Sequence, residues 1–131
     1  MVSAKGYEVA SRANVLQLPD VRSDAQQWAI EENGSGCLLV NKASEQALDV
    51  TGKNMESGTN NWMYDLNYFT AQTWVLSEVV PAQDGATCSI YSIINSKATA
   101  NVSGNPKAAG ANVQVSSFTG DISEKWMVHC V

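Results

Sequence analysis

The sequence predicts an all-β domain built from one structural unit repeated three times. A tryptophan segment recurs along the chain, in the copies Ala25-Gln26-Gln27-Trp28, Ala71-Gln72-Thr73-Trp74 and Ser123-Glu124-Lys125-Trp126. Fourteen positions before each tryptophan stands an asparagine: Asn14, Asn60 and Asn112. Eight positions before each asparagine stands a glycine: Gly6, Gly52 and Gly104. No segment shows convincing helical periodicity, whereas short apolar runs alternate with turn-forming residues. Such an internal repeat has to be interpreted before any single motif.

The second repeat shows the elements of the unit most clearly. Cys37-Leu38-Leu39-Val40 and Ala47-Leu48-Asp49-Val50 are strand-like, and Asn33-Gly34 before them is a hairpin signal because both residues tolerate positive φ. The remaining strands of the second and third repeats are expected at residues 60–64, 72–76, 89–94, 99–102, 112–115 and 125–128. Four strands in each of three repeats predict a β-trefoil, with repeats at about 1–32, 33–78 and 79–131. A small propeller is the alternative, and it is less favoured because propellers usually have four to eight blades.

The first repeat departs from this pattern at its start. When the repeats are aligned on their glycines, Met1 falls opposite Ala47, so the first repeat lacks a counterpart of residues 37–40. Either the chain was cut there, or the domain closes with eleven strands, or another chain supplies the twelfth. The spacing between the second and third tryptophans is longer than between the first two, and the extra residues are expected in a connecting loop at 77–87.

Length and composition limit the function. A chain of 131 residues fits one domain, 1–131, that can bury a core without a metal or a disulfide. The net charge is −5 and no run of Lys or Arg stands out, which argues against nucleic acid or an anionic membrane surface as the main partner. No apolar stretch approaches the roughly 20 residues of a transmembrane helix, so membrane insertion is not expected. The first residues do not have the hydrophobic segment of a secretory signal. The composition and charge of the chain favour a neutral or weakly polar ligand.

The residues needed for catalysis or metal binding are sparse. His129 is the single histidine, and Cys37, Cys88 and Cys130 have no Cys-x-x-Cys spacing, so we expect no metal, no cofactor and no enzymatic activity. Asp49 and Asp65 are a poor pair for glycoside hydrolysis, since Asp65 leaves its strand at a turn. In a trefoil barrel Cys88 and Cys130 would lie at the same rim, which predicts a disulfide between them and leaves Cys37 free.

The segments Gln26-Gln27-Trp28, Gln72-Thr73-Trp74 and the drifted Glu124-Lys125-Trp126 resemble the Gln-x-Trp signature of the ricin-B-type β-trefoil lectins. Leu48-Asp49-Val50-Thr51-Gly52 is similar to the family's Leu-Asp-Val strand and glycine, and the resemblance covers essentially the whole chain. It implies a non-catalytic domain that binds glycans or glycoconjugates in shallow pockets, up to one per repeat. It also implies an extracellular or cell-surface location, and possibly an oligomer or a larger parent protein.

The resemblance further implies a site in which an aspartate accepts hydrogen bonds from sugar hydroxyls and an aromatic ring stacks on the sugar. Period-2 alternation places Leu48 and Val50 inward and therefore Asp49 toward solvent; the same register places Trp62 and Tyr64 outward on that face. Flat aromatic rings bind the C–H faces of sugars at little entropic cost. The alternatives are that Trp62 packs under the loop 67–69 and that Asp49 accepts hydrogen bonds from the turn that follows it.

Two further residues complete the predicted site in the second repeat. Asn67 could supply a polar contact at its rim, and Gln72 is expected to orient Asp49 or the loop, while Ala71 stands where many family members carry a polar residue. The other repeats lack parts of this set. The first has Ser3, Leu16 and Leu18 at the positions of Asp49, Trp62 and Tyr64. The third has Asn101, Gln114 and Ser116 there. We therefore expect one working site of low affinity.

Two other functions compete with sugar binding. A domain that kept the fold and lost the sugar could serve as a protein-interaction module or spacer, with the Trp62 surface in a protein contact. A trefoil protease inhibitor would need a rigid exposed loop, and the longest candidate, residues 77–87, has Pro81 but little else to favour it.

Overall fold

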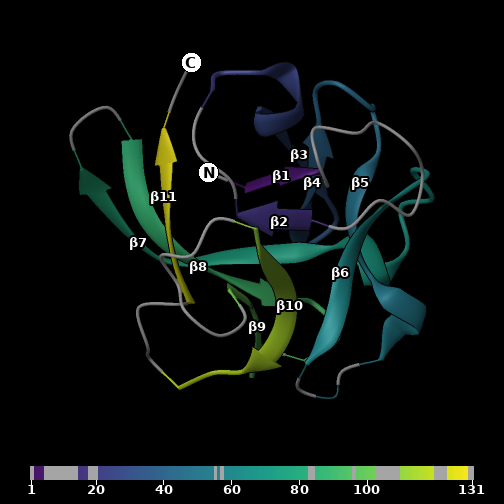
Figure 1. The fold of residues 1–131 in the computed structure, drawn as a ribbon. Helices are drawn as coiled ribbons and strands as arrows, with labels where there is room; N and C mark the ends of the chain where they lie inside the picture. Colours follow the sequence, from purple (N-terminus) through teal and green to yellow (C-terminus); the bar gives the residue numbers. More distant parts are fainter. Residues whose placement is uncertain are drawn as a thin grey trace.

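The computed structural model describes residues 2–4, 15–17, 21–54, 56, 58–82, 85–95, 97–102, 110–119 and 124–129. Within these residues the protein is all-β, with eleven strands joined by turns (Figure 1). The strands are β1 (Val2–Ala4), β2 (Val15–Gln17), β3 (Trp28–Asn33), β4 (Gly36–Asn41), β5 (Ala47–Val50), β6 (Thr59–Tyr64), β7 (Trp74–Ala82), β8 (Gly85–Ser92), β9 (Ala98–Val102), β10 (Ala111–Ser117) and β11 (Lys125–His129). Short 3-10 turns lie at Asp24–Gln26, Thr51–Lys53 and Thr70–Gln72. None of the helical turns in the described part of the chain has the length and apolar character to cross a membrane.

The predicted strands are present, with two corrections. The strand expected at 72–76 begins at Trp74, because Gln72 ends the 3-10 turn before it. The segment 77–87, expected to be a loop, is largely strand: β7 and β8 pair as a long antiparallel hairpin from Trp74↔Ser92 to Ala82↔Gly85, with a bulge between Ser77 and Val80. The extra residues of the third repeat therefore lengthen the β7–β8 hairpin, because the backbone pairing of these two strands continues through them.

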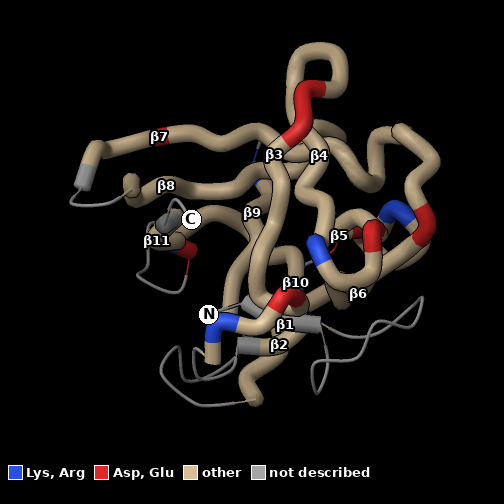
Figure 2. The backbone as a smooth tube through the Cα atoms, turned by 90° about the horizontal axis from the view of Figure 1, so that it is seen from above, with Lys and Arg blue, Asp and Glu red and all other residues tan. Residues whose placement is uncertain are grey.

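Seven strands close into a ring. The order is β10, β6, β5, β4, β7, β8 and β9, and β9 pairs again with β10 along five residues. All of these pairs are antiparallel, and β3, β11 and the hairpin β1–β2 attach to the ring at its sides. Seen from above, β7, β8 and β11 lie next to one another, as their pairing requires (Figure 2).

The core lies inside this ring and is built around Trp74, which is fully buried. The Trp28 and Trp126 side chains pack against the same cluster but are only partly buried. The indole of Trp74 donates to the Leu48 carbonyl and the indole of Trp126 donates to the Ala100 carbonyl, each at 3.0 Å. Two of the recurring tryptophans thus make the same hydrogen bond to equivalent strands.

The residue two before each recurring tryptophan has the same structural task in all three copies. The side-chain oxygens of Gln26 and Gln72 each accept a hydrogen bond at 3.0 Å from the backbone N–H five residues earlier. Glu124 accepts the equivalent bond from the Thr119 N–H at 2.8 Å and another from the Thr119 hydroxyl. These side chains are buried, so each one satisfies a turn that would otherwise have unpaired polar groups.

The repeated asparagines meet where the repeats join. The Asn112 amide nitrogen donates to the Asn60 side-chain oxygen at 2.7 Å, although the two residues are 52 positions apart. Gly52 adopts φ 61°, a conformation that glycine adopts without a Cβ penalty. Asn14, Gly6 and Gly104 lie outside the described residues.

The expected disulfide is not formed at Cys88. Cys37 and Cys88 are both buried free thiols, and Cys130 lies outside the described residues. Burial raises the pKa of both thiols above the ordinary value. They therefore serve as small apolar residues of the core, the alternative that the barrel interior favours.

Candidate functional site

Strands β5 and β6 bring the three predicted side chains Asp49, Trp62 and Tyr64 together. Asp49 and Trp62 are directly opposite each other in the antiparallel pair, and the Trp62 indole nitrogen donates to Asp49 Oδ1 at 2.9 Å. The ring of Tyr64 stacks on that of Trp62, with centroids 5.6 Å apart and planes inclined by 16°. A carboxylate and two nearly parallel rings therefore form one cluster on the outer face of the sheet, which we call the Asp49 cluster.

The prediction that Asp49 points to solvent is wrong. Leu48 and Val50 are buried on the inner face, as expected, but Asp49 is also buried, with 5% of its surface exposed. Alternation along a strand identifies the face on which a side chain lies; it does not identify what covers that face. Here Trp62 covers the carboxylate through its hydrogen bond, while the Trp62 and Tyr64 rings are half-buried.

Burial also changes the acidity of Asp49. Desolvation raises the pKa of its carboxyl above the usual value, and hydrogen bonds from the Trp62 and Gln72 side chains offset part of this rise. A raised pKa means that ionised Asp49 is less stable here than in water. The carboxylate is therefore held in a costly environment, which is common at functional sites.

Gln72 lies behind the cluster rather than at its rim. It is fully buried, and its amide nitrogen donates to the Asp65 carbonyl at 2.7 Å while its oxygen accepts the Asn67 N–H. These two hydrogen bonds tie Gln72 to the backbone of the loop at Asp65 and Asn67. Asn67 is half-buried, and its side-chain oxygen accepts from the Phe69 N–H at 2.9 Å.

The loop before the Gln-x-Trp segment adds two aromatic residues that the sequence analysis did not include. Tyr68 and Phe69 are more than 60% exposed, and the Lys53 ammonium lies 5.8 Å from the centre of the Phe69 ring. Tyr68 has φ 63°, an unusual backbone conformation for an aromatic residue. The signal in the sequence was the pair of adjacent aromatic residues in a polar loop.

The same strand register occurs in the other two repeats with different residues. Ser3 lies opposite Leu16 in β1 and β2, and Asn101 lies opposite Gln114 in β9 and β10, as Asp49 lies opposite Trp62. Neither pair combines an acid with an aromatic ring. Leu18 lies outside the described residues, and Ser116 stands at the position of Tyr64.

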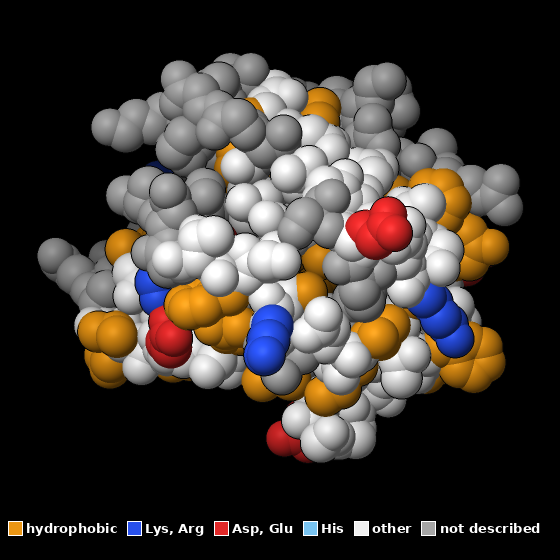
Figure 3. Space-filling view, turned by 90° about the horizontal axis from the view of Figure 1, so that it is seen from below, with side chains coloured by type: hydrophobic (Ala, Val, Ile, Leu, Met, Phe, Trp, Pro, Cys, Tyr) orange, Lys and Arg blue, Asp and Glu red, His pale blue; other side chains and the backbone are white. Residues whose placement is uncertain are grey.

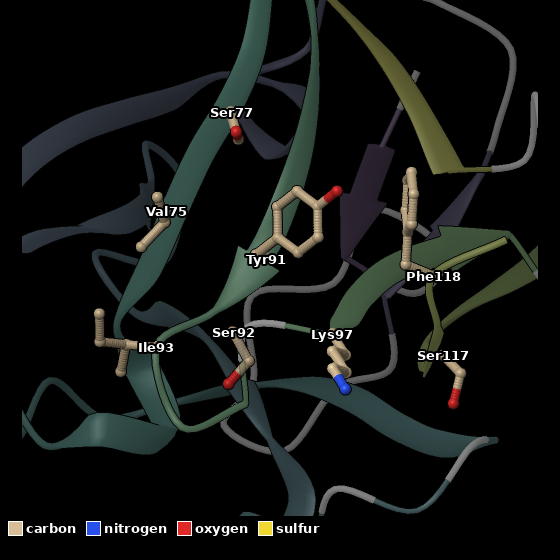
Figure 4. Close-up of a pocket in the computed structure, with 8 residues that line it drawn as sticks. All are labelled: Val75, Ser77, Tyr91, Ser92, Ile93, Lys97, Ser117 and Phe118. Carbon is tan, nitrogen blue, oxygen red and sulfur yellow. The ribbon is translucent and has the colours of Figure 1, made fainter. Parts of the chain in front are cut away.

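A second hollow, of about 610 Å³, is lined by residues of the second and third repeats (Figure 4). Tyr91 and Phe118 form its aromatic part, with ring centroids 5.6 Å apart and planes inclined by 42°. It is also lined by Val75, Ser77, Ser92, Ile93, Lys97 and Ser117. The hollow contains no carboxylate, so its polar groups are hydroxyls and one ammonium.

Among the described side chains, the contact of Ser89 with Lys125 comes closest to a catalytic nucleophile with a base beside it. The Lys125 ammonium donates to the Ser89 hydroxyl at 3.2 Å and forms an ion pair with Glu78. This pairing raises the pKa of Lys125, so the amine stays protonated and cannot take the proton of Ser89. Within the described part of the chain no three His, Cys, Asp or Glu side chains are grouped so that they could hold a metal ion.

Charged side chains are sparse on the surface of the molecule. On the face in Figure 3 the Lys, Arg, Asp and Glu side chains are scattered among uncharged and apolar ones.

Comparisons with known proteins bear on the family and the fold of the chain. Residues 1–64 match the family model described as a ricin-type beta-trefoil lectin domain-like family. Among curated proteins no sequence matches the chain. The resemblance to the ricin-B-type β-trefoil lectins is thereby confirmed.

Three solved structures illustrate the likeness. The designed threefold-symmetric protein ThreeFoil is 27% identical, with a TM-score of 0.87, over 99% of this chain and 90% of its own. An exo-beta-1,3-galactanase from Clostridium thermocellum is 27% identical with a TM-score of 0.86, and the match spans 98% of this chain but only 27% of that enzyme. The C-half of an earthworm R-type lectin, solved in complex with GalNAc, is 14% identical with a TM-score of 0.68, over 98% of this chain and 88% of its own, and shows the shared fold.

Proposed function

We propose that residues 1–131 form a single, non-catalytic carbohydrate-binding domain of three repeats, with one sugar site at the Asp49 cluster of the second repeat. The family resemblance supports sugar binding in general, and the earthworm lectin of the same fold was solved with GalNAc. The observation that carries the proposal is the contact of a buried carboxylate with two stacked, half-buried rings. An extracellular or cell-surface location accords with this function.

In this proposal each residue has a defined task. Tyr64 and Trp62 offer ring faces to the apolar side of a sugar, and Asp49 accepts hydrogen bonds from its hydroxyls. Because Asp49 is covered in the free protein, a sugar hydroxyl reaches it only when the Trp62 ring shifts from its present hydrogen bond. Asn67 contributes at the rim, and Gln72 acts indirectly by holding the loop.

The test is a glycan array followed by titration calorimetry with wild type, Asp49→Asn and Tyr64→Ser. Asparagine keeps an acceptor for Trp62 and removes the charge, and serine is the residue at the equivalent position of the third repeat. We expect each variant to lose at least about tenfold in affinity, the effect of one charged hydrogen bond or one ring contact. Phe118→Ala in the second hollow is the matched control and should bind like wild type. Binding that survives both site variants would refute this assignment, and binding lost only in Phe118→Ala would move the site to that hollow.

The rival function is a protein-interaction or spacer domain. The observation in its favour is that the indole of Trp62 already occupies Asp49 Oδ1 and leaves the carboxylate buried. This reading predicts no glycan binding at millimolar concentration, together with a normally folded protein.

A further inference from the structure

The second hollow lies between two pairs of strands. Val75 and Tyr91 lie opposite each other on β7 and β8 and form one wall. Phe118, which follows directly on β10, forms the other wall, and its backbone N–H donates to the Lys97 carbonyl at 2.7 Å just before β9. A space of about 610 Å³ bounded in this way is of the size that small molecules occupy in proteins.

One end of this hollow is apolar and the other is polar (Figure 4). The rings of Tyr91 and Phe118 lie toward one side of the view, and the Lys97 ammonium and the hydroxyls of Ser92 and Ser117 point toward the opposite side. Phe118 is 40% exposed, so part of its ring surface is open to a ligand. The hollow can therefore hold a molecule that has an apolar part and a polar part.

Lys97 gives the hollow a positive charge. It carries the one charge among the described residues that line the hollow, since desolvation raises the pKa of Tyr91 and its hydroxyl stays protonated. The Glu78 carboxylate interacts with the Tyr91 hydroxyl, but it is paired with the Lys125 ammonium, which balances its charge. Apolar walls beside one ammonium are complementary to an apolar ligand with a single negative charge.

The fold does not require this set of side chains, because the second repeat has other residues at the same places. Strand register gives the correspondence between the repeats. Val40, Leu66 and Glu45 of the second repeat stand where the third repeat has Tyr91, Phe118 and Lys97. The second repeat thus forms the same strands without either ring and without the ammonium.

At a further place the second repeat has a paired charge where the hollow has an apolar side chain. Lys42 corresponds to Ile93, since the N–H of each donates to the carbonyl of the residue before a recurring tryptophan. The Lys42 ammonium forms an ion pair with Asp24 at 3.1 Å, whereas Ile93 adds apolar surface to the hollow. The apolar lining is therefore a property of the third repeat, and burying it against a ligand is favourable.

We propose that the second hollow binds a small amphiphilic anion, with its apolar body against Tyr91 and Phe118 and its carboxylate at Lys97. The rings supply flat apolar contact area. The ammonium and the neighbouring serine hydroxyls donate hydrogen bonds to the carboxylate.

This site is separate from the Asp49 cluster. The residues that correspond to the cluster in the third repeat do not line the hollow; they are Asn101, Gln114 and Ser116. The ligand classes also differ, because the hollow selects a negative charge. The two proposals can therefore fail independently.

The experiment is a titration of the isotope-labelled 131-residue chain with phenylbutanoate, followed by amide NMR, with the uncharged phenylbutanamide as the matched ligand. We expect saturable shifts at residues 75–77, 91–93, 97 and 117–118, and none in β6. The carboxylate should bind about threefold to fivefold more tightly than the amide, the effect of one exposed ion pair. This difference should disappear at high salt, which screens the ion pair.

Two substitutions separate the apolar contact from the charged one. Phe118→Leu, which introduces the residue of the second repeat, should weaken both ligands about threefold to tenfold. Lys97→Gln should weaken the carboxylate about threefold to fivefold and leave the amide unchanged. Lys42→Gln removes an exposed lysine at a corresponding place of the second repeat, and as the matched control it should leave both affinities unchanged. Phe118 and Lys97 are exposed, and amide spectra as dispersed as those of wild type show that the variants fold.

The proposal is overturned if neither ligand shifts these amides at millimolar concentration, if the amide binds as tightly as the carboxylate, or if both substitutions leave binding unchanged. Displacement of phenylbutanoate by a glycan would also overturn it, because the hollow would then be a sugar site. If phenylbutanoate binds as expected and no glycan binds at all, only the sugar site at the Asp49 cluster is refuted.

Discussion

Individual buried polar side chains account for several properties of this domain. Asp49 is a carboxyl that the fold could replace, since Ser3 and Asn101 stand at its equivalent positions, yet it lies under an indole. Ionising a buried acid costs free energy, so its presence favours a task other than stability.

Asp49→Asn should raise the melting temperature at neutral pH. The pKa of Asp49 is raised in the folded state, so the folded protein binds more protons than the unfolded chain between the usual value of 3.8 and the raised one. Its contribution to the free energy of unfolding therefore falls as pH rises through this window. Thermal melts should show no advantage of Asp49→Asn below pH 3.8, an advantage that grows as pH rises through this window, and a constant advantage above it. A lower melting temperature of the variant at pH 7 would contradict the cost assigned to the carboxylate.

Asn61→Val should stabilise the protein. The Asn61 side chain is fully buried, and neither its oxygen nor its nitrogen has a hydrogen-bond partner among the described residues. Val15 and Val113 occupy the equivalent positions of the other repeats and are also buried, so valine fits the local shape. We expect the free energy of unfolding in denaturant to rise by about 1–3 kcal/mol, the cost of a buried unsatisfied polar group. Val113→Asn, the reverse change in the third repeat, is the matched control and should destabilise by a similar amount.

At the scale of the element, strand register makes the repeats comparable position by position. Asn101 and Gln114 face each other on β9 and β10 as Asp49 and Trp62 do on β5 and β6. What distinguishes the candidate sites is therefore the set of side chains on the strands, since the backbone pairing is the same. A site should be transferable between repeats.

The triple variant Asn101→Asp, Gln114→Trp, Ser116→Tyr should create a second sugar site. These positions are half-buried on the outer face, so larger rings find room there. For any glycan that binds wild type, calorimetry should show the stoichiometry rising from one to two per chain. The single change Ser116→Tyr is the control and should leave it at one. A triple variant that folds normally and still binds one sugar would mean that more than these three residues defines the site.

For the whole molecule, the proposed single site sets the expected strength of binding. A single site per chain gives low affinity for a soluble sugar, and retention on a surface requires several linked copies. A tandem fusion of two chains should therefore bind a glycan-coated surface about 10²–10⁴-fold more tightly than the single chain, while its affinity per site for the free sugar stays the same. Surface plasmon resonance on dense and sparse glycan surfaces measures both, and equal retention of both proteins would contradict a sugar site with one copy per chain.

Sequence periodicity alone determined the all-β class, most strands, the inward faces of Leu48, Val50 and Met63, and the grouping of Asp49 with Trp62 and Tyr64. These features depend on local alternation and on a repeat that relates distant segments, and both are visible in one chain. Only the tertiary structure decided that Asp49 is covered, that Gln72 is buried beneath a loop, that Cys88 is a free thiol and that Trp28 and Trp126 are only partly buried. Burial, pairing and hydrogen bonding of these groups depend on side chains that are far apart in sequence, and no local pattern states which of them will meet.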